Sequence, residues 1–145
     1  MTTITPTAVP TASDTSASTS TQHRPLWKAA GLSGLAAAAA TTVTVVAARA
    51  ADIAVAVQGE QIPLLGFAQL TLIGALLGLV VAQVLSRRAA HPRRTFVRTT
   101  VALTALSIIP DVVVDATLGS KLVLALTHVV AASIVIPAIA ARLAD

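Results

Sequence analysis

The sequence has no cysteine, few aromatic residues and little charge. Without cysteine, the chain has no disulfide framework, no thiolate zinc site and no thiol nucleophile. The net charge of +4 could indicate binding to nucleic acid. Aromatic residues make up only 2% of the 145 residues, however, so the chain lacks the side chains that stack on bases in such a surface. Only 11% of the residues are charged, against about 25% in soluble domains. These absences favour a protein with apolar surroundings.

Long apolar runs make up most of the chain. It is 55% hydrophobic, its mean hydropathy is +0.84, and His128 is the only ionisable residue in residues 29–48, 62–86 and 122–141. A membrane-spanning helix needs about 20 mostly apolar residues, and a soluble bundle would need polar helix faces that these runs lack. The sequence therefore predicts an all-α, antiparallel up-down four-helix transmembrane bundle. Its spans are expected at about residues 26–50, 63–86, 95–118 and 121–143.

The N-terminal segment differs from the rest in composition. Thr, Ser, Pro and Ala dominate residues 1–23, which cannot bury enough apolar surface to fold, so a disordered tail is predicted before a membrane domain at residues 24–145. The first span has a rival interpretation as a secretory signal, with Arg24 and Lys28 as its basic region and a cleavage site near residues 48–50. The length of the apolar run favours a retained span.

Basic residues gather between the second and third predicted spans. The cluster consists of Arg87, Arg88, Arg93, Arg94 and Arg98. Alternating spans place this cluster on the same side of the membrane as both termini. Because Lys and Arg accumulate on the cytoplasmic side, the cluster and both termini are predicted to be cytoplasmic, in the cell membrane. Contact with anionic lipid is expected as a consequence.

Small residues recur at every fourth position along the second span. They are Gly74, Gly78, Ala82 and Ser86. A ridge of this kind lets another helix backbone approach closely in lipid. The ridge is expected to pack against a neighbouring span, with a homodimer seam as the alternative.

The third span carries a row of polar side chains. The row consists of Thr100, Thr104, Ser107, Asp111 and Asp115. Spacings of three and four residues place all of them on one helical face. That face must look into the bundle or a wet cavity, because lipid cannot solvate it.

A histidine in the fourth span is predicted to lie level with this row. A turn at residues 119–120 would place Asp111 and His128 each about 12–13 Å from the turn, at a rise of 1.5 Å per residue. The two side chains can therefore meet between antiparallel helices. Asp115 would lie nearer the outer surface, within reach of Lys121.

Three functions are compatible with a polar cluster of Asp111, Asp115, His128 and Ser107. The leading interpretation is a structural clamp, in which His128 hydrogen-bonds Asp111. The second is a proton or cation path, because a carboxylate and an imidazole can exchange protons. The third is a metal or catalytic site, but these residues fall short of the usual ligand sets, and no Ser–His–Asp or phosphate-loop pattern is present.

We therefore expect a non-enzymatic membrane protein, without cofactor or metal, that packs in the lipid bilayer with itself or with a membrane partner. The alternative is a small transporter or a proton- or cation-conducting oligomer that uses Asp111, Asp115 and His128. The two differ in their interiors. A transporter needs a hydrated cavity that reaches Asp111, whereas an interaction protein needs a dry, well-packed core.

The last predicted span holds a leucine-rich stretch, a histidine and a small-residue tail with a proline. These residues are Leu124, Leu126, His128, Ala131, Ala132 and Pro137. Together with Ser107 and Pro110, a Ser-x-x-Pro late in the third span, this pattern resembles an uncharacterised family of small four-span membrane proteins from high-GC bacteria. The resemblance covers about residues 26–143. It implies the four-span architecture and no particular chemistry.

Overall fold

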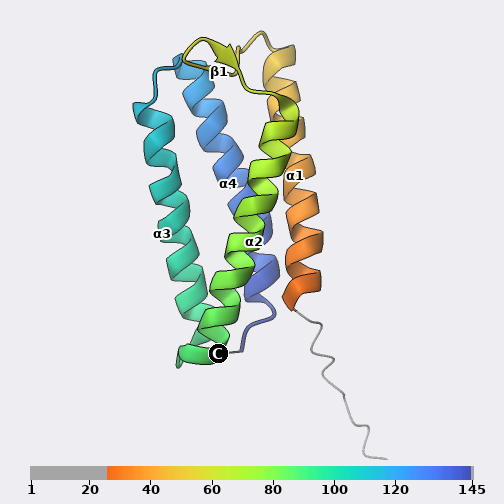
Figure 1. Cartoon of the computed structure of the whole chain (residues 1–145), viewed down its shortest axis with the longest axis vertical. Coiled ribbons are helices and arrows are strands. Elements are labelled where there is room, and N and C mark those ends of the chain that lie inside the picture. The colour runs from red at the N-terminus through yellow and green to blue at the C-terminus, as the bar shows by residue number, and fades with distance from the viewer. Residues whose placement is uncertain (1–25, 145) are drawn as a thin grey trace, which may run out of the picture.

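The computed structural model describes residues 26–144 of the chain. The predicted tail at residues 1–23, and Arg24, lie outside this part. Four helices follow one another up and down, and a short hairpin joins the first two (Figure 1). Their bounds are α1 (Leu26–Ala50), β1 (Ala56–Val57), β2 (Glu60–Gln61), α2 (Leu64–Arg88), α3 (Pro92–Val113) and α4 (Leu118–Ala140). Each helix is long and apolar enough to cross a membrane, which confirms the predicted four-helix transmembrane bundle.

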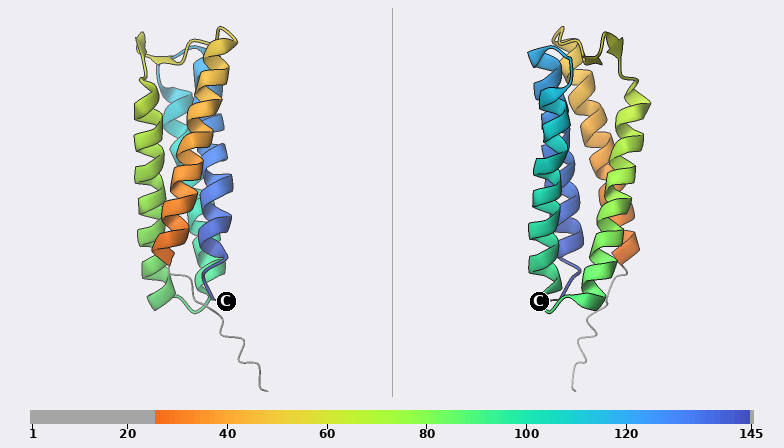
Figure 2. Two further views of the ribbon diagram at one scale, coloured as in Figure 1. Left: turned by 90° about the vertical axis from the view of Figure 1, so that its right-hand side faces the viewer. Right: turned by 60° about the vertical axis from the view of Figure 1, so that its left-hand side comes forward.

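The helices are arranged around the bundle in the order α2, α1, α4, α3. Helix α1 packs most extensively, against both α2 and α4, and α3 rests mainly on α4. The contact between α2 and α3 is smaller, and Figure 2 shows how these two helices are arranged. A cavity that α2, α3 and α4 line lies on this side of the bundle.

Small side chains explain why α1 and α2 lie close together. An added Cβ at Gly34 would lie 3.0 Å from the Cβ of Ala75, so the two backbones approach more closely here than larger residues would allow. Farther along the same interface, the hydroxyls of Thr41 and Thr71 are hydrogen-bonded across the helices at 3.1 Å. Both features follow the rule that helices associate in lipid through small residues and weakly polar pairs.

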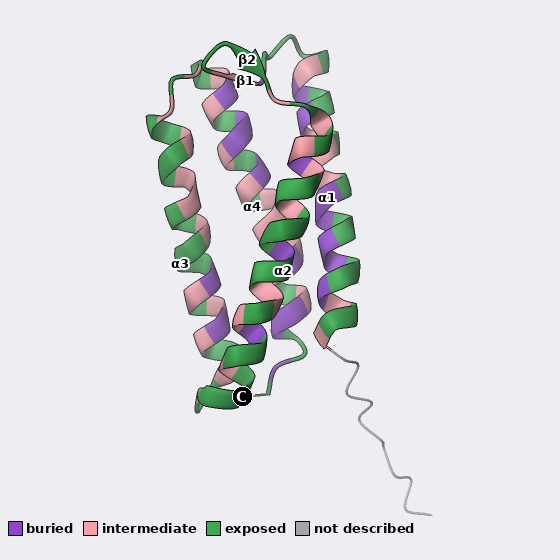
Figure 3. Cartoon of the chain, viewed as in Figure 1, coloured by how far each residue is buried: buried purple, intermediate pink, exposed green. Residues whose placement is uncertain are grey.

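The outward faces of the helices are strongly apolar. Leu32, Leu65 and Leu118 are 71%, 77% and 73% exposed, and many other leucines and valines lie on the same surfaces (Figure 3). Water-soluble monomers rarely expose apolar surface so continuously. A bilayer would solvate these faces with its acyl chains.

The hairpin at one end of the bundle was not expected from the sequence. Gln58 and Gly59 form its two-residue turn with φ angles of 53° and 83°, the left-handed geometry that such turns require. Helix α1 has already ended at Ala50, well before this turn. The backbone N–H of Gln58 donates to the carbonyl of Asp115 at 2.9 Å, which ties the hairpin to the connection between α3 and α4.

That connection differs from the predicted one. Helix α3 ends five residues early, after consecutive β-branched residues that have lower helix propensity, and α4 begins before the expected turn. Thr117 caps α4, and its Oγ1 accepts from the backbone N–H of Ser120 at 3.2 Å. Residues 119–120 therefore lie in the first turn of α4, and the prediction of a turn there is wrong. Gly119 is needed instead because Ile53 lies 2.9 Å from the position of a Cβ.

The opposite end of the bundle carries both described termini and the basic cluster. Leu26, Ala144 and the loop between α2 and α3 lie together there, far from the hairpin (Figure 1). The backbone N–H of Arg93 donates to the carbonyl of Ala144 at 3.3 Å. The five arginines predicted to set the topology are all exposed at this end.

Candidate functional site

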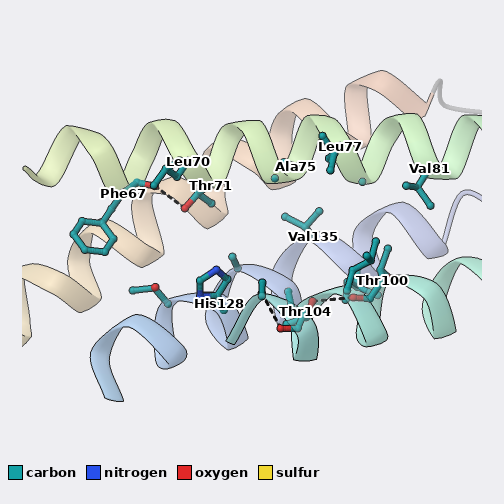
Figure 4. Close-up of a pocket in the computed structure, with 18 of the residues that line it drawn as sticks. Phe67, Leu70, Thr71, Ala75, Leu77, Val81, Thr100, Thr104, His128 and Val135 are labelled. Carbon is teal, nitrogen blue, oxygen red and sulfur yellow. Dashed lines mark hydrogen bonds between the residues drawn. The ribbon is translucent and has the colours of Figure 1, made fainter. Parts of the chain in front are cut away.

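A cavity of about 470 Å³ lies between α2, α3 and α4 (Figure 4). Its lining on α2 runs from Phe67 to Val81, a length of about 21 Å at 1.5 Å per residue. Leu70 and Leu77 on α2 and Leu103 on α3 line the cavity and are also exposed, so they form its mouth. The space is therefore a cleft that opens sideways.

The α2 wall of the cleft uses part of the predicted small-residue ridge. Gly74 lies on the cleft, and an added Cβ would meet no atom within 4 Å. Gly78 also lines the cleft, but the position of its Cβ lies 3.7 Å from Ile139 of α4. Ala82 is fully buried in the core, whereas Ser86 is exposed. In the monomer, the ridge thus serves a helix contact, the core and the cleft.

The α3 wall carries most of the predicted polar row. Thr100, Thr104, Ser107 and Asp111 all line the cleft. The three hydroxyls donate to carbonyls one turn back on their own helix, at distances of 2.7–2.9 Å from the oxygens of Phe96, Thr100 and Thr104. These bonds satisfy the hydroxyl protons and leave only lone pairs for another molecule.

Asp111 and His128 meet at the back of the cleft. The Nδ1 atom of His128 lies 2.9 Å from Oδ2 of Asp111 and 3.1 Å from the carbonyl of Leu124 on its own helix. One N–H cannot point well at both oxygens, and Oδ2 is buried without a well-directed hydrogen bond. The distance therefore shows that the two groups are neighbours, and the carboxylate remains an acceptor in need of a donor.

The depth of this pair follows from its place in α4. His128 lies ten residues after Leu118, or about 15 Å along the helix. The hydrocarbon core of a bilayer is about 30 Å thick, so the pair lies near mid-depth if the four helices span it. The side chain of Asp111 is 12% exposed and that of His128 is 38% exposed.

The third ionisable member of the predicted cluster lies elsewhere. Asp115 is exposed beyond the end of α3 and does not line the cleft. Lys121 does not need it as a partner, because its Nζ donates to the carbonyl of Val112 at 2.8 Å, the last turn of α3. The early end of α3 thus separates Asp115 from Asp111. Of the residues that line the cleft, Asp111 and His128 are the only ionisable ones.

The cleft has the composition of a binding site. Apolar side chains from three helices surround a single carboxylate and a single imidazole. In residues 26–144, no group of three or more His, Cys, Asp or Glu side chains is placed to hold a metal ion. Sequence reasoning missed the α2 wall, including Phe67 and Thr71, because a uniformly apolar helix has no polar marker of its inward face.

Four apolar helices around a lateral cleft define a multi-pass membrane protein. Comparison with known families matches residues 21–145 to a family of unknown function (DUF6069), and the chain belongs to that family. The match includes all four helices and every residue of the cleft. No curated protein and no solved structure matches the chain. The family assigns no activity, so function has to be argued from the cleft.

Proposed function

We propose that this protein binds an amphipathic small molecule that enters the cleft sideways from the bilayer, and that it does so without catalysing a reaction. The observation that carries the proposal is the cavity of about 470 Å³ that reaches Asp111 and His128. Small-molecule sites are typically clefts of about 300–1,000 Å³, mostly apolar with a few convergent polar groups. Helix bundles build such sites between facing helices.

The cleft changes the balance between the two functions expected from the sequence. The cavity reaches Asp111, which supports a binding or transport function more than a packing function that relies on a filled interior. Transport is the second candidate, and it is favoured by the 21 Å length of the α2 lining, about two-thirds of the hydrocarbon thickness.

Within this proposal, Asp111 and His128 also hold α3 against α4. Helix α3 has little contact with α2, so α4 provides most of its support. Hydrogen bonds between membrane helices contribute about 0.6 kcal/mol on average and about 1.7 kcal/mol at most. A polar contact of this size sets the register of α3 more than it sets overall stability.

A double-mutant cycle tests the contact. Asp111→Leu and His128→Leu should each destabilise the protein, since each removes one side of the polar contact between α3 and α4, and the double variant should lose less than the sum. The coupling energy is expected at about 0.6–1.7 kcal/mol, measured from unfolding in mixed detergent. The matched control pairs Asp111→Leu with Ser133→Ala, an exposed position on α4, and should be additive. Additive losses in the first cycle would show that the clamp does not exist.

Filling the cleft tests the binding function. Gly74→Leu adds a side chain where the cleft is open, so it should block the site without disturbing a helix contact. The probe is a diazirine-labelled decanol, photo-crosslinked to the full chain in lipid nanodiscs and located by mass spectrometry. We expect labelling of cleft residues in the wild type and a loss of about tenfold in Gly74→Leu, equivalent to 1.4 kcal/mol of binding free energy.

Gly31→Leu is the matched control for that experiment. Gly31 is an exposed glycine on α1, with no atom within 4 Å of its Cβ position, and it does not line the cleft. Its labelling pattern should equal that of the wild type. A small-molecule site would be refuted if the crosslinked probe were spread evenly over lipid-facing leucines and its distribution did not change in Gly74→Leu. A fall in oligomer mass caused by Gly74→Leu, without cleft labelling, would instead identify a second copy as the occupant.

A further inference from the structure

We propose that the cleft selects lipophilic cations, with the positive group of the ligand placed at Asp111. The inference rests on the proposed binding function and assigns the ligand's chemical class. Asp111 is the only acidic residue that lines the cleft, and no Lys or Arg lines it. The nearest lysine in the sequence, Lys121, is occupied by the carbonyl of Val112 outside the cleft. The charge of the cleft is therefore negative when Asp111 is ionised and His128 is neutral.

The hydrogen-bonding groups of the cleft point to the same ligand. Every hydroxyl that lines it donates to a carbonyl of its own helix. These donors are Thr71, Thr100, Thr104, Ser107 and Thr127. Because their protons are used, the hydroxyls offer acceptors to a ligand and no free donor. An anion, which needs donors, finds none among them.

The imidazole completes this pattern. Both neighbours of Nδ1 in His128, the Asp111 carboxylate and the Leu124 carbonyl, are acceptors. A neutral ring therefore carries its proton on Nδ1, and Nε2 is left as an acceptor. While the imidazole is neutral, the polar groups that line the cleft are the Asp111 carboxylate, of which Oδ2 is itself buried, Nε2 of His128 and the hydroxyl oxygens, and all of them are acceptors. A cation or a strong donor complements it, and an anion does not.

The more apolar part of the cleft accounts for the rest of the ligand. Leu77 and Val81 of α2 and Val135 of α4 line it, on one side of His128 along the bundle (Figure 4). Thr100 and Thr104 of α3 lie on the same side and leave acceptors only, because their protons are donated to their own helix. A molecule with a positive group and an apolar body would bury both against matching surfaces. Such molecules partition into bilayers and would reach the lateral mouth from the lipid.

Two ions of the same size and shape test the sign of the charge. Tetraphenylphosphonium is a lipophilic cation and tetraphenylborate is its anionic isostere. Binding of each to the full chain in nanodiscs of zwitterionic lipid is measured by equilibrium dialysis and corrected for partition into protein-free nanodiscs. The wild type should bind the cation at least about tenfold more tightly than the anion, the selectivity that one charge-assisted contact provides.

Variants locate the charge at Asp111. Asp111→Asn keeps the size of the side chain and should weaken cation binding by about tenfold to a hundredfold, while Asp111→Glu should retain most of it. Circular dichroism and the elution volume of each variant verify the fold. If Asp111→Asn unfolds, the question is decided by cation binding to Asp111→Glu and by the comparison of tetraphenylphosphonium with tetraphenylborate on the wild type.

The outcomes separate the charge proposal from the binding proposal. Cation selection would be overturned if the wild type bound both ions equally, or if Asp111→Asn bound the cation as well as the wild type does. If Gly74→Leu still blocked the decanol probe, the cleft would remain a binding site without charge selectivity. If Gly74→Leu changed neither the labelling by decanol nor the binding of either ion, the binding function itself would be overturned. Preference for the cation that is lost in both Gly74→Leu and Asp111→Asn is the expected result.

Discussion

Replacing Gly34 with leucine is expected to separate α1 from α2 and to lower the free energy of unfolding by about 3 kcal/mol or more. A Cβ at this position would already lie 3.0 Å from the Cβ of Ala75 and 3.7 Å from the Cδ2 of Leu72. Leucine adds three further carbons beyond this Cβ, and Ala75 can yield only if the helix moves. Overpacking of this kind costs typically 1–3 kcal/mol, and more where the backbone must shift.

Unfolding of the purified protein in detergent measures the effect, and Gly31→Leu again provides the comparison. Gly31 lies one turn before Gly34 on α1 and has open space around it, so its substitution should change stability by less than about 0.5 kcal/mol. Equal stability of the two variants would contradict the close contact between α1 and α2. Intermediate loss in Gly34→Ala would support it, because the methyl group alone requires a shift of only a few tenths of an ångström.

Reporter fusions after Arg94 and after Gly59 are expected to give opposite, all-or-none signals, with Arg94 in the cytoplasm. The two positions lie at opposite ends of the bundle (Figure 1). The exposed arginines of the basic cluster lie at the same end of the bundle as Arg94. Lys and Arg close to the ends of membrane spans favour the cytoplasmic side. A fusion after Ala144 should agree with Arg94, since the two segments are in contact.

The same fusions test whether the first helix is retained. A cleaved signal would leave a mature chain that starts near Ala51, which intact mass spectrometry would detect. Identical signals from Arg94 and Gly59 would exclude four membrane spans. A reversed pair of signals would preserve the bundle but place the basic cluster and the termini outside.

The number and approximate position of the helices could be predicted because bilayer thickness sets a length that apolar runs either reach or do not. Their ends could not, because tertiary contacts decide them. Thr117 caps α4 ahead of Gly119, where Ile53 leaves no space for a side chain, and Lys121 donates to the carbonyl of Val112 in the last turn of α3. The contacts of Ile53 and Lys121 have no sequence signature.

The candidate site was predictable in part for the same reason. Counting residues from the predicted turn at residues 119–120 placed Asp111 level with His128, and the structure has these side chains 2.9 Å apart although the connection lies at residues 114–117. The count failed for Asp115, which a longer helix would have kept on the polar face. The cleft itself depends on which helix pairs pack tightly, and that choice is made by single small residues such as Gly34.

The dependence of α3 on α4 has a consequence for biosynthesis. A ribosome delivers the helices in chain order, so α1 and α2, which pack well together, reach the bilayer as a pair. Helix α3 follows and meets only a small surface on α2, while the helix that supports it has not yet been made. Until α4 arrives, Asp111 has no His128 beside it, and a charged group at the centre of a membrane helix costs about 2.5–3.5 kcal/mol on insertion scales. Release of α3 from the translocon is therefore the step at which the nascent chain depends most on the segment still to be translated.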